Sequence, residues 1–337
     1  MAGKTHRIGT SIIDVAKVFA TEEACLALLE TARWPEGVRC LKCDFDKVSR
    51  FVTNETTRKR INSKGVEVTV MIPARHVYLC NNAKCKHQFT ATAGTVFNDT
   101  HLPLNKWFMA AAMMCNAKKG LSAKQMERDL GVSYKTAWYL CHRIRKAMDE
   151  GLGDLMTGTV EADETYVGGK FDKRRKRAKY DKEPVFGVIE RGGRIHVSHL
   201  EQENRYQIMR EIKENVAPEA KMMTDESRYY ISLQKHGFQH EIVVHSNKEW
   251  VRGDVHTQNI DGFWSLFKSG LIGSFHQVSI KHLHRYLNEF EFRFNNKRNE
   301  DIFAIVLMNL VIQKGIKYAE LTGKKGEQVP KDEYEPF

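Results

Sequence analysis

Apolar residues recur at two different spacings along the chain, and each spacing predicts a different kind of element. Spacing of three to four residues predicts helices at 22–33, 107–115, 123–130, 134–148, 206–216, 229–235, 259–269, 279–295 and 301–314. Alternation of apolar and polar residues predicts strands at 66–72, 76–79, 159–167, 184–190, 194–198 and 221–225. A hairpin turn at 191–193 joins two of these strands. Strands followed by alternating helices predict a mixed sheet with helices packed on it.

The helices at 123–130 and 134–148 are separated by a short turn that contains Gly131. Two helices joined in this way are typical of a helix-turn-helix, whose second helix contacts DNA. Its candidate DNA-binding residues lie outside the apolar stripe and are Tyr134, Lys135, Thr136, Arg143 and Arg145. N-terminal side chains of such a helix meet base edges, and its cations meet phosphates. An ordinary pair of helices with no DNA contact is the alternative interpretation.

Two pairs of cysteines bracket a strand-rich stretch near the N-terminus. Cys40 and Cys43 form a CxxC pair, and Cys80 and Cys85 form a second pair with four residues between them. Zn²⁺ prefers four thiolates in a tetrahedron, and two knuckles of this kind can supply them. The gap between the knuckles is longer than is usual in a zinc ribbon. His87 could replace one sulfur, and a pair of unrelated core thiols is the alternative.

The composition adds a positive charge to this picture. The 337 residues include 53 Lys and Arg against 42 Asp and Glu, a formal net charge of +11, and 42% hydrophobic residues exclude global disorder. Such a balance favours a polyanionic partner, nucleic acid before membrane, although a basic protein without such a partner also fits. The densest basic stretch spans 170–182 and includes Lys173, Arg174, Arg175, Lys176 and Arg177. It lies between two predicted strands and is either a phosphate-binding loop or a solvated one.

No stretch reaches the roughly 20 apolar residues of a membrane span, since the longest, 303–312, is interrupted by Asn309. The N-terminus lacks an apolar signal core followed by a cleavage site. We therefore expect a cytoplasmic protein with reduced thiols, associated with the nucleoid if the source is a prokaryote. The seven cysteines are then metal ligands or core thiols.

Three acidic residues occupy positions that solvated carboxylates seldom occupy. Asp163 lies within a predicted strand, Asp225 ends another, and Asp261 opens a predicted helix. Carboxylates from three elements that converge can hold two divalent ions about 3.5–4 Å apart, the arrangement used for phosphoryl transfer. Mg²⁺ prefers such an oxygen-rich shell. Most of the acids in a chain are simply solvated, so this pattern by itself is weak.

An ordered set of motifs extends over roughly residues 19–300. It comprises RWPEG at 33–37, AGTVF at 93–97, EADETYVGGK at 161–170, TDE at 224–226, HTQNIDGFWSLFK at 256–268, HLHRYLNEF at 282–290 and RFNN at 293–296. In this set the chain resembles the DDE transposases of prokaryotic insertion sequences of the ISXO-like class, which are related to the eukaryotic Merlin transposases.

The resemblance implies an RNase H-like core with Asp163 and Asp225 as its first two metal ligands. Asp261 falls where the family carries its third acidic or amide residue, most often Glu or Asn, and Lys268 matches the lysine that follows. Asp261 and Lys268 are two helical turns apart and can share one helix face. Aspartate is one methylene shorter than glutamate, and Asn259 is a nearby oxygen donor that could assist it. The implied cofactors are Mg²⁺ or Mn²⁺ in the catalytic site and structural Zn²⁺.

We therefore expect an α+β multidomain chain with an N-terminal zinc ribbon and helix-turn-helix, followed by an RNase H-like α/β catalytic core. The expected divisions are a helical segment at 1–37, the zinc ribbon at 38–98, the helix-turn-helix at 99–152, the core at 153–300 and a C-terminal helix and tail at 301–337. The expected function is a transposase that binds the inverted-repeat ends, cleaves them and joins the 3′ ends to target DNA, as a homodimer or higher oligomer. The alternatives are a non-catalytic, transposase-derived DNA-binding protein and an RNase H-like nuclease without strand transfer.

Overall fold

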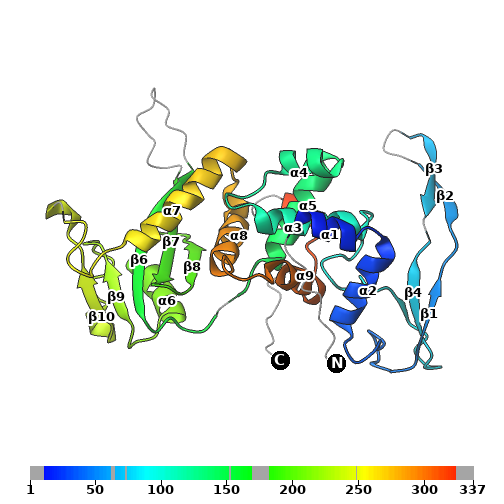
Figure 1. Cartoon of the computed structure of the whole chain (residues 1–337), viewed down its shortest axis with the longest axis horizontal. Helices are drawn as coiled ribbons and strands as arrows, with labels where there is room; N and C mark the ends of the chain where they lie inside the picture. The colour runs from blue at the N-terminus through cyan, green and yellow to red at the C-terminus, as the bar shows by residue number, and fades with distance from the viewer. Residues whose placement is uncertain are drawn as a thin grey trace. The chain divides into compact units, whose positions relative to one another are not determined.

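A computed structural model describes residues 11–61, 65–72, 74–151, 153–168, 182–247 and 249–323 (Figure 1). The chain forms two compact units. One consists of Ser11–Met109 and Leu307–Gly315, and the other contains Ala110–Val306 together with the segment that begins at Ile316. The predicted helix-turn-helix belongs to the same unit as the large sheet.

The first unit combines short helices with small antiparallel sheets. Its elements are α1 (Ile12–Val18), α2 (Glu22–Arg33), β1 (Val48–Val52), β2 (Thr56–Ile61), β3 (Glu67–Ile72), β4 (His76–Cys80), β5 (Gln88–Phe89), the start of α3 (Leu104–Asn116) and the end of α9 (Ile302–Ile312). Strands β1, β4 and β5 pair in the order β1-β4-β5, and within the described part of the chain β2 and β3 form a separate two-stranded sheet. The hydroxyl of Thr21 accepts a hydrogen bond from the Ala24 nitrogen at 3.2 Å and begins α2, as its sequence predicts.

The second unit is built on a five-stranded mixed sheet. Its elements are α4 (Ala123–Leu130), α5 (Tyr134–Ala147), β6 (Thr159–Gly168), β7 (Lys182–Glu190), β8 (Ile195–His199), α6 (Arg205–Asn215), β9 (Lys221–Thr224), η1 (Gln234–His236), β10 (Gln239–Ile242), η2 (His245–Asn247), α7 (Gln258–Gly270), η3 (Leu271–Phe275), η4 (Ile280–His282), α8 (Leu283–Asn295) and α10 (Tyr318–Thr322). The strand order is β10-β9-β6-β7-β8. Strands β6, β7 and β8 are antiparallel neighbours, whereas β9 runs parallel to β6 and β10 runs parallel to β9. The expected RNase H-like sheet is therefore present.

Helices cover both faces of this sheet. Alternate residues of the strands, such as Val160 and Ala162, pack with Ile208 and Ile212 of α6 on one face. On the other face, Val185 and Ile195 are among the residues that pack against α7 and α8; Figure 1 shows α7 lying across the strands. Because side chains alternate along a strand, the two sides of β6 enter two separate cores.

One predicted helix is wrong. Residues 229–233 form successive turns instead, in which the Leu233 nitrogen donates to the carbonyl of Tyr230 at 3.0 Å, and η1 begins at Gln234. Tyr230 and Leu233 are fully buried in the core beneath α6. A tight turn brings side chains three residues apart to the same side of the chain, so both can enter this core. The alternating pattern also failed to reveal β10, which lies at the edge of the sheet. No helix in the described ranges combines the length and apolar character that a membrane crossing requires.

Candidate functional site

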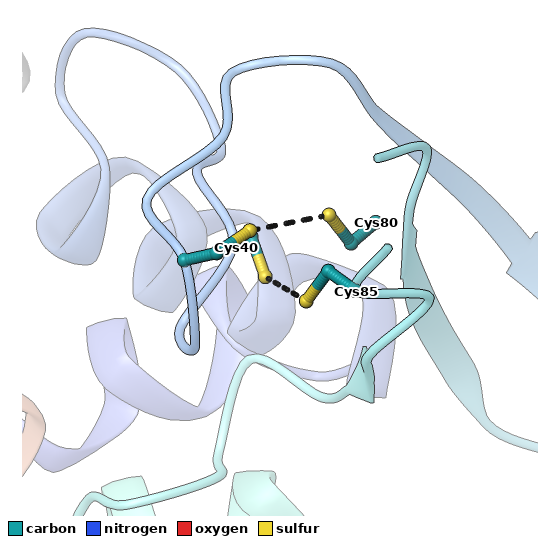
Figure 2. A group of neighbouring side chains, drawn as sticks. Cys40, Cys80 and Cys85 are labelled. Atoms are coloured by element: carbon teal, nitrogen blue, oxygen red, sulfur yellow. Dashed lines mark hydrogen bonds between the residues drawn. The ribbon is translucent and has the colours of Figure 1, made fainter. Parts of the chain in front are cut away.

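The four predicted zinc ligands converge on one point in the first unit. One sulfur from each of Cys40, Cys43, Cys80 and Cys85 lies within 4.8 Å of all the others. The Sγ atoms of Cys40 and Cys85 are 3.8 Å apart, and those of Cys43 and Cys80 are 3.6 Å apart. Figure 2 shows the labelled sulfurs turned toward one another.

These distances fit a tetrahedral zinc site. Zn–S bonds of about 2.3 Å place the sulfurs of a tetrahedron about 3.8 Å apart. His87 is not needed as a ligand, because four sulfurs already complete the shell, and its ring stacks on Phe89 at 5.8 Å. A closed shell of four thiolates supports a structural rather than a catalytic role for the metal.

Helices α4 and α5 lie where the sequence predicts the two helices of a helix-turn-helix, with Gly131 between them. Ser122 and Ser133 cap them, accepting hydrogen bonds from the nitrogens of Gln125 and Thr136 at 3.1 and 3.2 Å. Gly131 ends α4 with a φ of 59°, a left-handed conformation that favours glycine. Because these capping residues and this glycine are local signals, the bounds of α4 agree with the prediction and α5 ends one residue earlier than predicted.

The candidate DNA-binding residues of α5 divide into two groups. Tyr134 and Lys135 are exposed and Thr136 is partly exposed, at the N-terminal end of the helix. Arg143 and Arg145 are only 4% and 2% exposed. We therefore leave these two arginines out of the DNA surface that we propose below.

Arg145 belongs to a buried ionic cluster. Its Nε donates to Glu289 of α8 at 2.6 Å, and Arg293 also donates to that carboxylate. Glu289 is fully buried. Although burial opposes its ionisation, the two arginines lower the pKa of Glu289 below its ordinary value. This cluster ties α5 to α8, so Arg145 has a structural role.

The C-terminal helix α10 lies beside the exposed end of α5. The ammonium of Lys135 is 4.3 Å from the centre of the Tyr318 ring, and Tyr139 donates to the carbonyl of Ile316. The ring centres of Tyr139 and Tyr318 are 5.6 Å apart. Lys135 therefore has an aromatic neighbour that the sequence did not suggest.

Asp163 lies at the centre of the large sheet, on β6. Burial raises its pKa to about 7, and the negative charges of Asp261 and Asp225 contribute to this increase. The indole nitrogen of Trp264 donates to Asp163 at 3.0 Å. Opposite Asp163 on β7 stands Gly187, where a Cβ would come within 2.8 Å of the Trp264 ring. The missing side chain of Gly187 thus leaves room for the indole that positions Asp163.

The other two aspartates come from the ends of neighbouring elements. Asp225 follows β9 directly and accepts a hydrogen bond from the Ser227 nitrogen at 2.9 Å. Asp261 is in the first turn of α7, where burial raises its pKa and the charge of Lys268 opposes that increase. Lys268 lies seven residues further along the same helix, and its contact with DNA phosphate stays a prediction.

The three aspartates do not form a ligand cluster of the kind that the cysteines form. Among the described residues, the four cysteines are the one group placed to hold a metal ion, with their ligand atoms within 4.8 Å of one another. What links Asp163 to Asp225 and Asp261 is electrostatic, since their charges contribute to its raised pKa. A metal site shared by the three aspartates therefore stays a prediction from the sequence.

Glu161 is a residue of this region that the sequence analysis missed. It is fully buried on β6 and accepts hydrogen bonds from the nitrogens of Asn259 and Ile260 at 2.8 and 3.1 Å. The side-chain amide of Asn259 also donates to it at 2.7 Å, and Arg191 donates at 2.8 Å. Glu161 therefore fixes the start of α7, and Asn259, proposed above as a possible metal donor, has its amide engaged here. The only sequence signal was a second acidic residue on the same face of the strand as Asp163.

The basic stretch that contains Lys173 to Arg177 lies outside the described residues. Its proposed contact with phosphate stays a prediction from the sequence.

Comparison with known proteins identifies both units. Residues 155–295 match the model of the ISXO2-like transposase domain, and residues 20–88 match the model of the transposase zinc-ribbon domain. The chain is also 30% identical over 295 residues to an uncharacterized protein in transposable element ISH50 of Halobacterium salinarum. That alignment covers 82% of this chain and 92% of the relative. The chain therefore belongs to the family of ISXO2-like insertion-sequence transposases.

Proposed function

We propose that this chain binds the inverted-repeat ends of an insertion sequence, cleaves them and joins the freed 3′ ends to target DNA. Membership of a transposase family implies a DNA-cleaving and DNA-joining enzyme. The observation that supports the proposed chemistry most directly is the electrostatic interaction of Asp163 with Asp225 and Asp261. These three residues come from β6, the end of β9 and the start of α7.

In this proposal Asp163, Asp225 and Asp261 hold Mg²⁺ or Mn²⁺. Burial and, after it, the negative charges of Asp261 and Asp225 raise the pKa of Asp163, and a bound cation would offset these charges. When bound, the metal pair activates the attacking water or 3′ hydroxyl and stabilises the leaving oxygen. Asp261 is preferred over Asn259 as the third ligand, because it carries a negative charge that acts on Asp163.

The remaining residues act by positioning. Trp264 orients the carboxylate of Asp163 through a hydrogen bond to one of its oxygens. Glu161 holds the first turn of α7, the turn that carries Asp261. Lys268 is exposed on α7 and supplies a positive charge for a DNA phosphate near the carboxylates.

DNA binding is proposed for the zinc ribbon and for the start of α5, through Tyr134, Lys135 and Thr136. The basic segment with Lys173 to Arg177 would add phosphate contacts. Because two ends have to be joined, at least a dimer is expected on DNA, and in a prokaryotic cell it would work at the nucleoid.

The test uses Asp163→Asn and Asp225→Asn with two DNA substrates, an intact element end and a pre-cleaved end. Both variants should bind the end normally but lose cleavage and joining by at least about a hundredfold, because the charge that holds the metal is removed. Asp301→Asn, at an exposed position before α9, is the matched control and should retain both activities. Activity that persists in both variants contradicts the proposal. A wild-type chain that cleaves but never inserts a pre-cleaved end is a nuclease instead.

A further inference from the structure

A two-stranded hairpin extends from the zinc-ribbon sheet. Strands β1 and β4 pair from Val48 and Cys80 up to Val52 and His76. Beyond them two hydrogen bonds join Thr53 and Arg75, a pair that we call the neck. The Thr53 nitrogen donates to the Arg75 carbonyl at 2.9 Å, and the Arg75 nitrogen donates to the Thr53 hydroxyl at 3.0 Å. Strands β2 and β3 then continue the hairpin, as Figure 1 shows. We call Thr56–Ile61 and Glu67–Ile72 the β2–β3 arm.

The β2–β3 arm packs on no third strand among the described residues. Large apolar side chains are exposed on it, with Ile61 at 73% and Met71 at 66%. A lone two-stranded hairpin is marginally stable in water and gains stability from a partner. The exposed surface of the arm therefore indicates a binding element.

The positive charge of the arm favours an anionic partner. Residues 53–76 contain five Lys and Arg but only two Glu. Arg58 and Lys59 are exposed neighbours on β2, so their side chains leave opposite faces of the arm. Arg75 is exposed at the neck. Lys59 lies 3.5 Å from Glu67, but both side chains are largely exposed, so this ion pair is weak and leaves Lys59 accessible.

The dimensions of the arm suit a groove of DNA. Two paired strands are about 4.8 Å apart, and six residues extend over about 20 Å. The major groove of B-DNA is about 12 Å wide and admits a two-stranded ribbon. Because the groove is walled by two phosphate backbones, cations on both faces of a ribbon can be neutralised there.

We propose that the β2–β3 arm is a DNA-binding element that inserts into the major groove of the element end. This inference rests on the proposed function and deepens it, since it assigns groove contact to a specific hairpin between the zinc knuckles. Exposed charges on edge strands also prevent strand-to-strand aggregation, and a second copy of the chain could pair with the arm. The experiment separates these roles.

The first variant is the triple substitution Arg58→Gln, Lys59→Gln and Arg75→Gln. The probes are a duplex with the terminal inverted repeat and a duplex of scrambled sequence, titrated over a range of salt concentrations. Each phosphate contact contributes about 0.9 to the slope of log affinity against log salt, so the slope should fall by about 2 to 3. Affinity for the repeat at physiological salt should fall at least about tenfold. The matched control removes three exposed cations from the other unit, Lys213→Gln, Lys235→Gln and Arg298→Gln, and should leave the slope unchanged.

The second variant replaces residues 54–74 by an Asn-Gly turn, which the neck between Thr53 and Arg75 can accommodate. Its zinc content should equal that of the wild type, which shows that the ribbon still folds. Dimethyl sulfate reports guanine N7 atoms in the major groove. Protection should disappear over one patch of the repeat and persist over the patch covered by the helix-turn-helix.

The other outcomes overturn the inference. An unchanged salt slope and footprint in both arm variants means that the arm does not contact DNA. Aggregation of the triple variant with normal DNA affinity assigns the charges to edge protection, and loss of self-association with normal affinity assigns the arm to a second copy. A wild type that binds neither duplex refutes the proposed end binding itself, together with this inference.

Discussion

Glu161 accepts hydrogen bonds from both the backbone nitrogen and the side-chain amide of Asn259, at 2.8 and 2.7 Å. These contacts join the central strand to the helix that carries Asp261, across 98 positions of sequence. A carboxylate at a helix N-terminus satisfies free backbone donors and interacts favourably with the helix dipole. The position of the third proposed ligand thus depends on a residue that does not itself bind metal in our proposal.

Replacing Glu161 by Gln should weaken both the fold and the site. The NH₂ group of the glutamine is a donor and would face the N–H donors of Asn259 or Ile260, so a hydrogen bond would be lost. The ion pair with Arg191 would be lost as well. Disruption of a buried charged hydrogen-bond network of this kind costs about 3 kcal/mol of unfolding free energy. We expect a lower melting temperature and a higher Mg²⁺ concentration for half-maximal cleavage.

A double-mutant cycle with Arg191→Gln tests the origin of this effect. Arg191 also donates to the backbone carbonyls of Asp254 and His256 at 2.7 and 2.9 Å, so its own replacement should loosen the segment before α7. If Glu161 and Arg191 act as one unit, the double variant should lose less stability than the sum of the single losses. Strict additivity, with an unchanged Mg²⁺ requirement, would show that Glu161 does not position α7.

Gly187→Ala should impair catalysis through Trp264. The added Cβ would lie 2.8 Å from the indole ring, so the ring must move and its hydrogen bond to Asp163 must weaken. Overpacking of this kind costs about 1–3 kcal/mol. Cleavage rate and melting temperature should both fall, while affinity for the DNA end is retained.

The variant Gly187→Ala with Trp264→Phe separates packing from hydrogen bonding. The smaller ring should relieve the clash and restore part of the stability. Cleavage should stay low, because phenylalanine has no N–H to donate to Asp163. Full recovery of cleavage would rule out a positioning role for the indole.

The sequence predicted the elements around the site better than the contacts within it. Alternation located β6 and therefore Asp163, and serine caps located α4 and α5. Glu161 was overlooked because its partner Asn259 is remote in sequence, and acidic residues are too common for one to stand out. Long-range burial of this kind becomes visible only when the strands and helices are assembled.

For Glu161 a role was overlooked, whereas for Arg145 the sequence suggested a DNA contact that its burial does not support. Its positive charge and its place on the second helix of a helix-turn-helix predict a phosphate contact, but Glu289, 144 positions away, pairs with it in the core. The helix predicted at 229–235 was wrong for a similar reason. Their apolar residues fit a helix, whereas the buried positions of Tyr230 and Leu233 favour tight turns. In both cases tertiary packing, rather than local pattern, determines the outcome.

Cys40→Ser should release zinc from the first unit. Serine is a poor Zn²⁺ ligand, and the remaining three thiolates leave the tetrahedron incomplete. Metal analysis should show about one Zn²⁺ per chain in the wild type and a large loss in the variant, with a less stable N-terminal unit. Cys115→Ser, in α3 outside the cluster, is the control and should retain the metal. A wild type purified without zinc would contradict the assignment.

His196 should make the stability of the second unit depend on pH. Burial lowers its pKa, but its partners Glu211 and Glu291, at 3.5 and 3.1 Å, outweigh burial and raise the pKa to about 9. The folded state therefore holds the proton more tightly than the unfolded state, whose pKa is about 6.5. The stabilisation, about 3 kcal/mol, is complete below about pH 6.5 and is lost as the pH rises through about 9.

The variant His196→Gln carries no titratable group at this position. The difference in unfolding free energy between wild type and variant, measured by urea denaturation, should be largest at pH 6 and should shrink by about 3 kcal/mol toward pH 10. His236→Gln, at an exposed position in η1, is the control for the loss of an imidazole elsewhere in the unit. A difference for His196→Gln that stays constant with pH would mean that the two glutamates do not hold a protonated imidazole between them.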